Sequence, residues 1–281
     1  MTGVKALASA VDHIAGRSTA MISVILNIVP DEGHESRLQA ALALVESQGG
    51  HISCVQTITL LPAPPDPTVA GSEVEGLIEM EQLAKEFQES VEATLEASGA
   101  EWSWHRFYGD PATILIDRAR LADVVILSAN DSWPPVSSVT LHSRAPVLAV
   151  PSPDPNFIPD RPALIAWNGS SPAADAVRGA MPMLDHMEPV QILSIDGDSE
   201  GFPASLVQQY LYEHSIRSDA HFRPLDPEKH VADAIIEQSE ELGSSMIVAG
   251  AFGHNRLREM LLGSVTRELL KKSPIPLLLA H

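Results

Sequence analysis

Short apolar runs alternate with longer amphipathic stretches along most of the chain. In the first half the runs occupy residues 21–29, 52–60, 102–107, 124–128 and 147–150. Between them, apolar residues spaced by three and four predict helices at 37–48 and 73–98. Because parallel strands need a crossover long enough to hold a helix, this alternation predicts an α/β fold with a parallel sheet covered on both faces.

The second half repeats the same order of elements. Strands are predicted at 163–167, 190–195, 221–225 (the weakest pattern), 246–249 and 277–280, and helices at 173–184, 203–214, 229–242 and 265–272. Local echoes support a duplication, since residues 123–127 match 245–249 and residues 145–150 match 275–280. We therefore expect two tandem five-stranded domains, residues 1–150 and 163–281, joined by a proline-rich linker at 151–162. Residues 1–20 are expected to be a flexible arm or a short leading helix.

The long helix at 73–98 has two contrasting faces. A stripe spaced by three and four predicts a buried face made of Leu77, Met80, Leu83, Phe87, Val91 and Leu95. The other face carries eight glutamates and Lys85, between Glu73 and Glu96. We interpret this acidic face as solvated, with a docking surface for a basic partner as the alternative.

Charge and cysteine content narrow the class of protein. The 18 Lys and Arg against 37 Asp and Glu give a formal net charge of −19, which disfavours nucleic acid as a partner. The single cysteine, Cys54, excludes an intramolecular disulfide and fits a reducing cytoplasm. No uncharged apolar run is long enough to cross a bilayer, so no membrane association is expected. The histidines lack metal-ligand spacing, so no metal site is predicted.

One glycine-containing segment follows the predicted strand at 246–249. It has the pattern G-x2-G-x9-G-S, with glycines at Gly250, Gly253 and Gly263 and with Ser264 opening a helix. Glycines let a ligand approach the backbone closely, and Ser264 is a candidate N-cap. The N–H groups of Ser264, Val265 and Thr266 then predict a phosphate site at the positive end of the helix dipole. Five of the Lys and Arg residues of this half gather here: Arg256, Arg258, Arg267, Lys271 and Lys272.

A second candidate piece is the turn after the strand at 163–167. In a 3-2-1-4-5 strand order the first and fourth strands are neighbours, so Asn168 should face Gly250 across a crevice where such sheets bind ligands. Asn168 could hydrogen-bond a ribose or base, and the strand end at 193–196, which includes Ile195, could offer backbone groups to an adenine edge. The alternatives are an asparagine that only holds its Asn-Gly turn and glycines that only form strand-to-helix turns.

These motifs resemble those of the universal stress protein family in its tandem two-domain form. The resemblance rests on the G-x2-G-x9-G-S pattern, the Asn168-Gly-Ser170 turn and the terminal segment 273–279. It implies Rossmann-like domains paired as an internal pseudo-dimer, ATP or AMP as the bound nucleotide with Mg²⁺ as an accompanying ion, and a role in stress survival. The implied binding residues are Ala166, Asn168, Ile195, Gly250, Gly253, His254, Arg256, Gly263, Ser264, Val265 and Thr266.

Two departures from the family pattern change what we expect. Family members usually have Asp where this chain has Asn168, so the ribose contacts should differ. The corresponding segment of the first half, residues 128–138, is shorter, has no glycine and contains Pro134 and Pro135, which remove two N–H donors. We therefore predict that the first half binds no nucleotide and serves as a pairing partner.

Three functions remain open at this point. The first is a nucleotide-binding stress protein that acts through contacts with a protein partner, with at most slow ATP hydrolysis. The second is an acidic docking scaffold with no nucleotide, and the third is an ATP-consuming enzyme. No P-loop, GxGxxG, GxSxG or HExxH motif supports catalysis, and His254 with Glu259 is a weak acid–base pair. The pairing strands should be 146–150 and 276–280, and an unpaired edge there would favour a homodimer.

Overall fold

The computed structural model describes residues 21–59, 70–129, 134–153, 157–187, 189–197, 201–251 and 263–281. The predicted arm at 1–20 lies outside the described residues. Of residues 70–75 the helical backbone is described.

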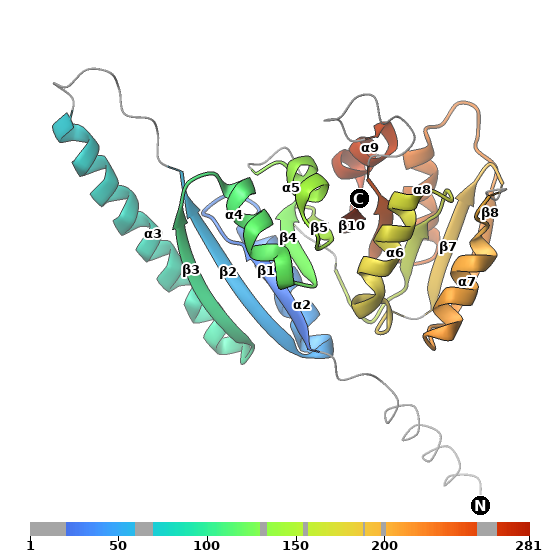
Figure 1. Ribbon diagram of the computed structural model, residues 1–281, viewed down its shortest axis with the longest axis horizontal. Helices are drawn as coiled ribbons and strands as arrows, with labels where there is room; N and C mark the ends of the chain where they lie inside the picture. Colours follow the sequence, from blue (N-terminus) through green and yellow to red (C-terminus); the bar gives the residue numbers. More distant parts are fainter. Residues whose placement is uncertain are drawn as a thin grey trace, which may run out of the picture.

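Ten strands form one sheet in the order β3-β2-β1-β4-β5-β10-β9-β6-β7-β8. The N-terminal half, β1 to β5 with its helices, and the C-terminal half, β6 to β10 with its helices, each show the order 3-2-1-4-5, and Figure 1 shows the two halves side by side. All neighbours pair in parallel except β5 and β10. The strands are β1 (Ile22–Asn27), β2 (Gly50–Ile58), β3 (Glu101–Tyr108), β4 (Val124–Ser128), β5 (Val147–Val150), β6 (Ala163–Ala166), β7 (Val190–Ile195), β8 (Ser218–Arg223), β9 (Met246–Gly250) and β10 (Leu277–Ala280).

Helices pack on both faces of this sheet. One apolar cluster contains residues of α2, α3, α6 and α7, and a second cluster on the opposite face contains residues of α4, α5, α8 and α9. The bounds are α2 (His34–Gln48), α3 (Ala70–Ser98), α4 (Pro111–Arg118), α5 (Val136–His142), α6 (Ser171–Leu184), α7 (Ala204–Glu213), α8 (Val231–Glu241) and α9 (Ser264–Lys272), with a 3-10 turn at Ala119–Leu121. The predicted α/β fold is therefore confirmed.

The differences from the sequence prediction have local causes. The weak pattern at 221–225 belongs to β8, which begins three residues earlier, at Ser218. This strand lies at the edge of the sheet, where an alternation of apolar residues is not required. The helices α4 and α5 were not predicted. They are short, at 8 and 7 residues, so neither supplies enough turns for a recognisable apolar stripe.

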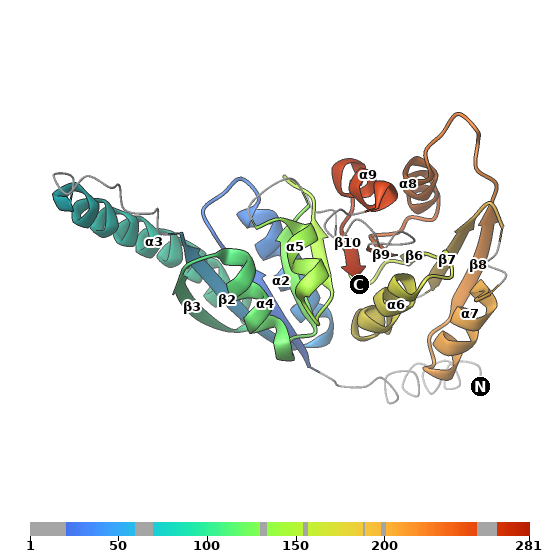
Figure 2. The same cartoon turned by 45° about the horizontal axis from the view of Figure 1, so that its top comes forward.

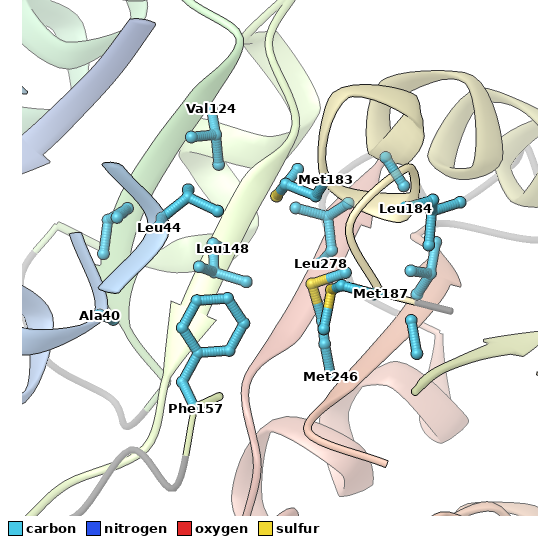
Figure 3. Packing of buried hydrophobic residues seen from close by; sticks show 14 of the residues in the cluster. Ala40, Leu44, Val124, Leu148, Phe157, Met183, Leu184, Met187, Met246 and Leu278 are labelled. Atoms are coloured by element: carbon cyan, nitrogen blue, oxygen red, sulfur yellow. The ribbon is translucent and has the colours of Figure 1, made fainter. Parts of the chain in front are cut away.

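The two halves join through an antiparallel pair of strands. Leu277, Leu278 and Leu279 of β10 lie opposite Ala149, Leu148 and Val147 of β5. Figure 3 shows Leu148 and Leu278 at this junction, with Leu44 of α2 on one side and Met183 of α6 on the other. The predicted pairing of terminal strands is confirmed, and β10 is not an unpaired edge because β5 and β9 flank it.

The proline-rich segment between β5 and β6 packs onto both halves. Ser36 Oγ donates to the Pro153 carbonyl at 2.5 Å, and Ser245 Oγ donates to the Ile158 carbonyl at 2.6 Å. Phe157 is only 7% exposed and lies beside Leu148 in Figure 3. This segment therefore adds contacts to the junction between the halves as well as connecting them.

The predicted buried stripe of α3 is only half right. Val91 and Leu95 are buried against the sheet, but Leu77 and Leu83 are 39% and 57% exposed. Figures 1 and 2 both show the reason, which is that the amino-terminal part of α3 extends past the edge strand β3. A 29-residue helix spans about 44 Å and a nine-residue strand about 30 Å, so the sheet is too short to cover it.

The single thiol of the chain is buried under α3. Cys54 is 0% exposed, and this burial, with a smaller contribution from the negative charge of Glu92, raises the pKa of the Cys54 thiol to about 12. The reactive species is the thiolate, so we expect a thiol reagent at about pH 8 to label the native protein far more slowly than the urea-unfolded chain. Equal labelling rates, followed by absorbance, would show that this region of the fold opens readily.

Candidate nucleotide site at the carboxyl edge

The candidate residues of the C-terminal half meet at one edge of the sheet. Ala166, the last residue of β6, pairs with Ala249 of β9. Asn168 comes just after β6 and Gly250 ends β9, so both residues lie at the carboxyl ends of adjacent strands. Ile195 ends β7 on the other side of β6. The first and fourth strands of this half, β6 and β9, are therefore neighbours, as predicted.

Gly250 is required by the fold itself. A Cβ built on Gly250 would lie 2.5 Å from the backbone nitrogen of Ala173 and 2.6 Å from the carbonyl carbon of Pro172. These backbone atoms belong to the first turn of α6, which cannot yield as a flexible side chain could. Close packing of α6 against β9 thus accounts for this glycine without a ligand.

Gly263 has the opposite surroundings. A Cβ added there would meet no described atom within 4 Å, and its φ of −52° is open to any residue. Space in front of this backbone is what a bound ligand would need. The motif glycines therefore have different roles, which their spacing alone did not distinguish.

The amino terminus of α9 corrects one prediction. Gly263, not Ser264, is the N-cap residue, no side chain caps the helix, and Ser264 is the first helical residue. The first intrahelical bond runs from Arg267 N–H to the Gly263 carbonyl, which leaves the N–H groups of Ser264, Val265 and Thr266 outside the helical ladder. Thr266 Oγ1 donates to the Gly250 carbonyl at 3.3 Å and so holds this helix end against β9.

The Asn168 side chain holds its own Asn-Gly turn, which is the alternative to a ligand contact given by the sequence. Its Oδ1 accepts hydrogen bonds from the backbone N–H and the hydroxyl of Ser170, at 3.1 and 2.7 Å, and Ser170 in turn caps α6. The Asn168 side chain is exposed. Its Nδ2 amide group has no protein partner within the described part of the chain, so a donor remains at this position.

Four apolar side chains lie at the same carboxyl edge, since Ala166 and Ile195 end β6 and β7, and Val231 and Val265 lie in the first turns of α8 and α9. Ala166, Ile195, Val231 and Val265 are all partly buried and pack against the same apolar cluster. Of these, Val231 was missed by the sequence analysis, because it begins α8 and carries no motif. This edge therefore combines apolar side chains with N–H groups that lie outside the helical ladder, which suits a flat heterocycle joined to an anion.

The end of β7 has unusual backbone geometry. Asp196 has a φ of 60° and Gly197 a φ of 106°, both in the left-handed region. The Asp196 Oδ1 accepts a hydrogen bond from the Leu225 N–H at 2.7 Å, which ties the loop after β7 to the loop after β8. The sequence signal for this bend was the Asp-Gly pair, a frequent turn dipeptide.

Arg37 fills the matching edge of the N-terminal half. This side chain is 0% exposed and lies where β1 and β4 end, between Asn27 and Ser128. Its Nε donates to the Asn27 carbonyl at 2.8 Å, and its terminal nitrogens bond both Asp31 carboxylate oxygens at 2.9 and 3.0 Å. A further bond joins Arg37 to Ser128 Oγ. The guanidinium group thus lies between the ends of the first and fourth strands of this half, the position that corresponds to Asn168 and Gly250 in the C-terminal half.

The close approach of helix and strand is made differently in the two halves. Ser128 ends β4 as Gly250 ends β9, and a Cβ on Gly33, the N-cap of α2, would meet Ser128 Oγ at 2.4 Å. The N-terminal half therefore places its glycine on the helix and its larger residue on the strand. This exchange makes room for the Arg37 to Ser128 contact.

A family model and two curated sequences each match part of the chain, and the model matches its last part. The model of the universal stress protein family matches residues 227–281. Universal stress protein Slr1230 of Synechocystis is 37% identical over 49 residues, 17% of this chain and 17% of that protein. Stress response protein NhaX of Bacillus subtilis is 42% identical over 48 residues, 17% of this chain and 29% of that protein. The chain thus matches less than a third of the length of these curated relatives.

Residues 227–281 belong to the universal stress protein family. The predicted resemblance to this family is therefore confirmed.

The likeness of the whole chain to known structures is one of fold. A universal stress protein from Archaeoglobus fulgidus superposes with a TM-score of 0.71 at 19% identity, covering 92% of this chain and 97% of that one. PA1789 of Pseudomonas aeruginosa, a protein described as functionally unknown, gives a TM-score of 0.57 at 16% identity, covering 93% of each chain. Both comparisons span the two halves, which supports the tandem arrangement of the universal stress protein fold.

The matched segment contains only part of the candidate site. Gly250, Gly263, Ser264, Val265 and Thr266 fall within the universal stress protein match. Ala166, Asn168 and Ile195 precede it, and their position depends on strand pairing. Gly253, His254 and Arg256 also fall within the match, but they lie outside the described residues.

The local positive charge is partly committed to ion pairs. Lys272 Nζ lies 3.0 Å from Asp233 and 2.9 Å from Glu268. These hydrogen bonds lower the pKa of both carboxyl groups and raise the pKa of Lys272, first through Glu268 and then through Asp233. Lys272 therefore joins α9 to α8 and is not a spare cation for a phosphate group.

The buried Arg37 gives a test of the N-terminal half. Replacing it as Arg37→Met keeps most of the side-chain length but leaves the Asp31 carboxylate and the Asn27 carbonyl without this donor. We expect the free energy of unfolding, from urea titration, to fall by about 3–5 kcal/mol. The control Arg178→Ala removes an exposed ion pair with Asp175 and should cost less than about 1 kcal/mol. Equal losses in the two variants would contradict a structural role for the Arg37 network.

Proposed function

We propose that this chain binds an adenine nucleotide, ATP or AMP, at the carboxyl edge of its C-terminal half. The observation that carries the proposal is the N-terminus of α9, where three N–H groups outside the helical ladder lie next to Gly263 and its open space. Such a helix end binds a phosphate group through its N–H groups and its dipole. The apolar side chains of Ala166, Ile195, Val231 and Val265 offer the surface for the base.

Each candidate residue has a separate role in this proposal. Ser264, Val265 and Thr266 donate backbone N–H groups to the phosphates, and the Asn168 amide donates to the ribose. Gly250 keeps α6 close to β9 and so supports the site without touching the ligand. Gly253, His254 and Arg256 belong to the family motif and are assigned phosphate contacts on that ground, with Mg²⁺ as the accompanying ion.

We also propose how the chain divides. Residues 163–281 are the nucleotide-binding domain, residues 1–150 are a degenerate partner domain and residues 151–162 are the linker. The buried Arg37 supports this division, since it fills the corresponding edge of the N-terminal half. One nucleotide per chain follows from it.

The proposed activity is binding rather than turnover. Within the described residues no nucleophile is paired with a base at the carboxyl edge of the C-terminal half. The nucleotide would then change how a cytoplasmic stress protein contacts its protein partner. An acidic docking scaffold without nucleotide remains the second candidate, because Leu77, Ile78 and Leu83 of α3 are exposed among glutamates.

The number of bound nucleotides tests the proposal directly. The freshly purified protein is denatured, any released nucleotide is identified by mass and absorbance, and the protein is then titrated with ATP and Mg²⁺ by calorimetry. We expect close to one nucleotide per chain. Two per chain would show that the N-terminal half also binds, and none by either method would favour the docking scaffold.

A pair of glycine variants tests where the nucleotide binds. Gly263→Val adds a side chain in open space, so the protein should keep its unfolding midpoint but lose at least about tenfold in ATP affinity. Gly250→Val puts a Cβ against the α6 backbone, so we expect its free energy of unfolding to fall by about 1–3 kcal/mol or more. The control Gly76→Val adds the same side chain in open space on α3 and should change neither property. Unchanged ATP affinity in folded Gly263→Val would disprove the site.

A further inference from the structure

Two histidines converge on one serine in the N-terminal half, far along the chain from the family motif. The Nε2 atom of His51, on β2, lies 2.9 Å from Ser103 Oγ. The Nε2 atom of His105, on β3, lies 3.1 Å from the same oxygen. Both imidazoles therefore direct a ring nitrogen at one point in space.

The strand register explains how the cluster forms. The pairs His51 with Glu101, Ser53 with Ser103, and Val55 with His105 place alternate residues of β2 and β3 on one face of the sheet. On this face the short helix α4 packs near the carboxyl ends of the two strands, where Val55 and Phe107 join its apolar cluster. The amino-terminal part of the face is left accessible, with His51 and Ser103 half-buried and His105 exposed.

The two hydrogen bonds fix where the protons of this group lie. A serine hydroxyl can donate its single proton to only one of the two rings, so the other ring must donate its own Nε2 proton to the oxygen. An ion that accepted electron pairs from both Nε2 atoms would replace these two hydrogen bonds, and the proton of the donating ring would move to its Nδ1. Neutral imidazole is a ligand for zinc, copper and nickel, with metal–nitrogen distances of about 2.0–2.1 Å.

We propose that His51 and His105 form a two-histidine binding site for a divalent transition metal ion of the zinc and copper class. Water molecules and the Ser103 hydroxyl complete the coordination, and small rotations of the accessible side chains bring the two nitrogens to bonding distance. The register places Glu101 beside His51, which adds negative charge at the site. Within the described residues no three His, Cys, Asp or Glu side chains form a metal cluster, so this site is of the weaker, solvent-accessible kind.

Calorimetry with Zn²⁺ on the full chain, without nucleotide, tests the proposal. Each of His51→Gln and His105→Gln should weaken the tightest Zn²⁺ binding by about tenfold or more, and the double variant should abolish it. The matched control is His221→Gln, on β8, where the ring bonds a single partner, Gln191, at 2.5 Å. Because the cluster is partly solvent-accessible, the two single variants and the double variant should keep the wild-type unfolding midpoint.

A second readout identifies the ligands without relying on affinity. Substoichiometric Cu²⁺ is paramagnetic, so it should broaden the imidazole proton signals of His51 and His105 before those of the other histidines. Broadening that begins at other histidines, or wild-type Zn²⁺ affinity in the folded double variant, would overturn the proposal. Neither measurement involves the carboxyl edge of the C-terminal half, so the result is independent of nucleotide binding.

Discussion

The antiparallel pairing of β5 with β10 joins the two halves of the chain into one continuous sheet. Each strand is short and apolar, and without the other it would be an exposed edge with unpaired N–H and carbonyl groups. Pairing them removes both edges and places Leu148 opposite Leu278 (Figure 3). Burying a side chain of this size contributes about 1.5–3 kcal/mol, and the packing of Phe157 extends the buried surface across both halves. A single sheet with two matched carboxyl edges is the result.

The carboxyl edges of the two halves have the same strand order but carry different side chains. In the N-terminal half the guanidinium group of Arg37 joins the ends of β1 and β4 and is neutralised by Asp31, so the protein's own side chain fills the space between these strand ends. In the C-terminal half the corresponding edge has apolar side chains and the N–H groups of α9. A duplicated fold keeps its strand order because the core requires it, whereas the side chains at the strand ends are free to change. Ser128 at the end of β4 and Gly250 at the end of β9 are an example of such a change at corresponding positions.

The elements themselves could be predicted because each depends on local properties of the chain. The strands Val124–Ser128, Val147–Val150, Val190–Ile195 and Leu277–Ala280 are buried on both faces of the sheet and therefore appear as uninterrupted apolar runs. Two predictions about individual residues were wrong, because the local pattern does not show which other parts of the fold surround a residue. Leu83 has the spacing of a buried position on α3, yet it is exposed because this part of the helix extends past the edge strand β3. Ser264 has the chemistry of an N-cap, yet the helix begins one residue earlier in the chain, with Gly263 as its cap.

The fold class, the duplication, the junction strands and the resemblance to the universal stress protein family could all be inferred from the amino-acid sequence, because they follow from periodicity and motif spacing along the chain. The contacts of each polar group and glycine became clear only from the folded structure. The Oδ1 of Asn168 holds its own turn, Gly250 faces α6, and Arg37 is buried, and the spacing of residues in the sequence shows none of these contacts. The same holds for His51 and His105, which are separated in the chain and meet because β2 and β3 pair in register. Contacts between distant residues are set by strand pairing and packing, and these exist only once the sheet has formed.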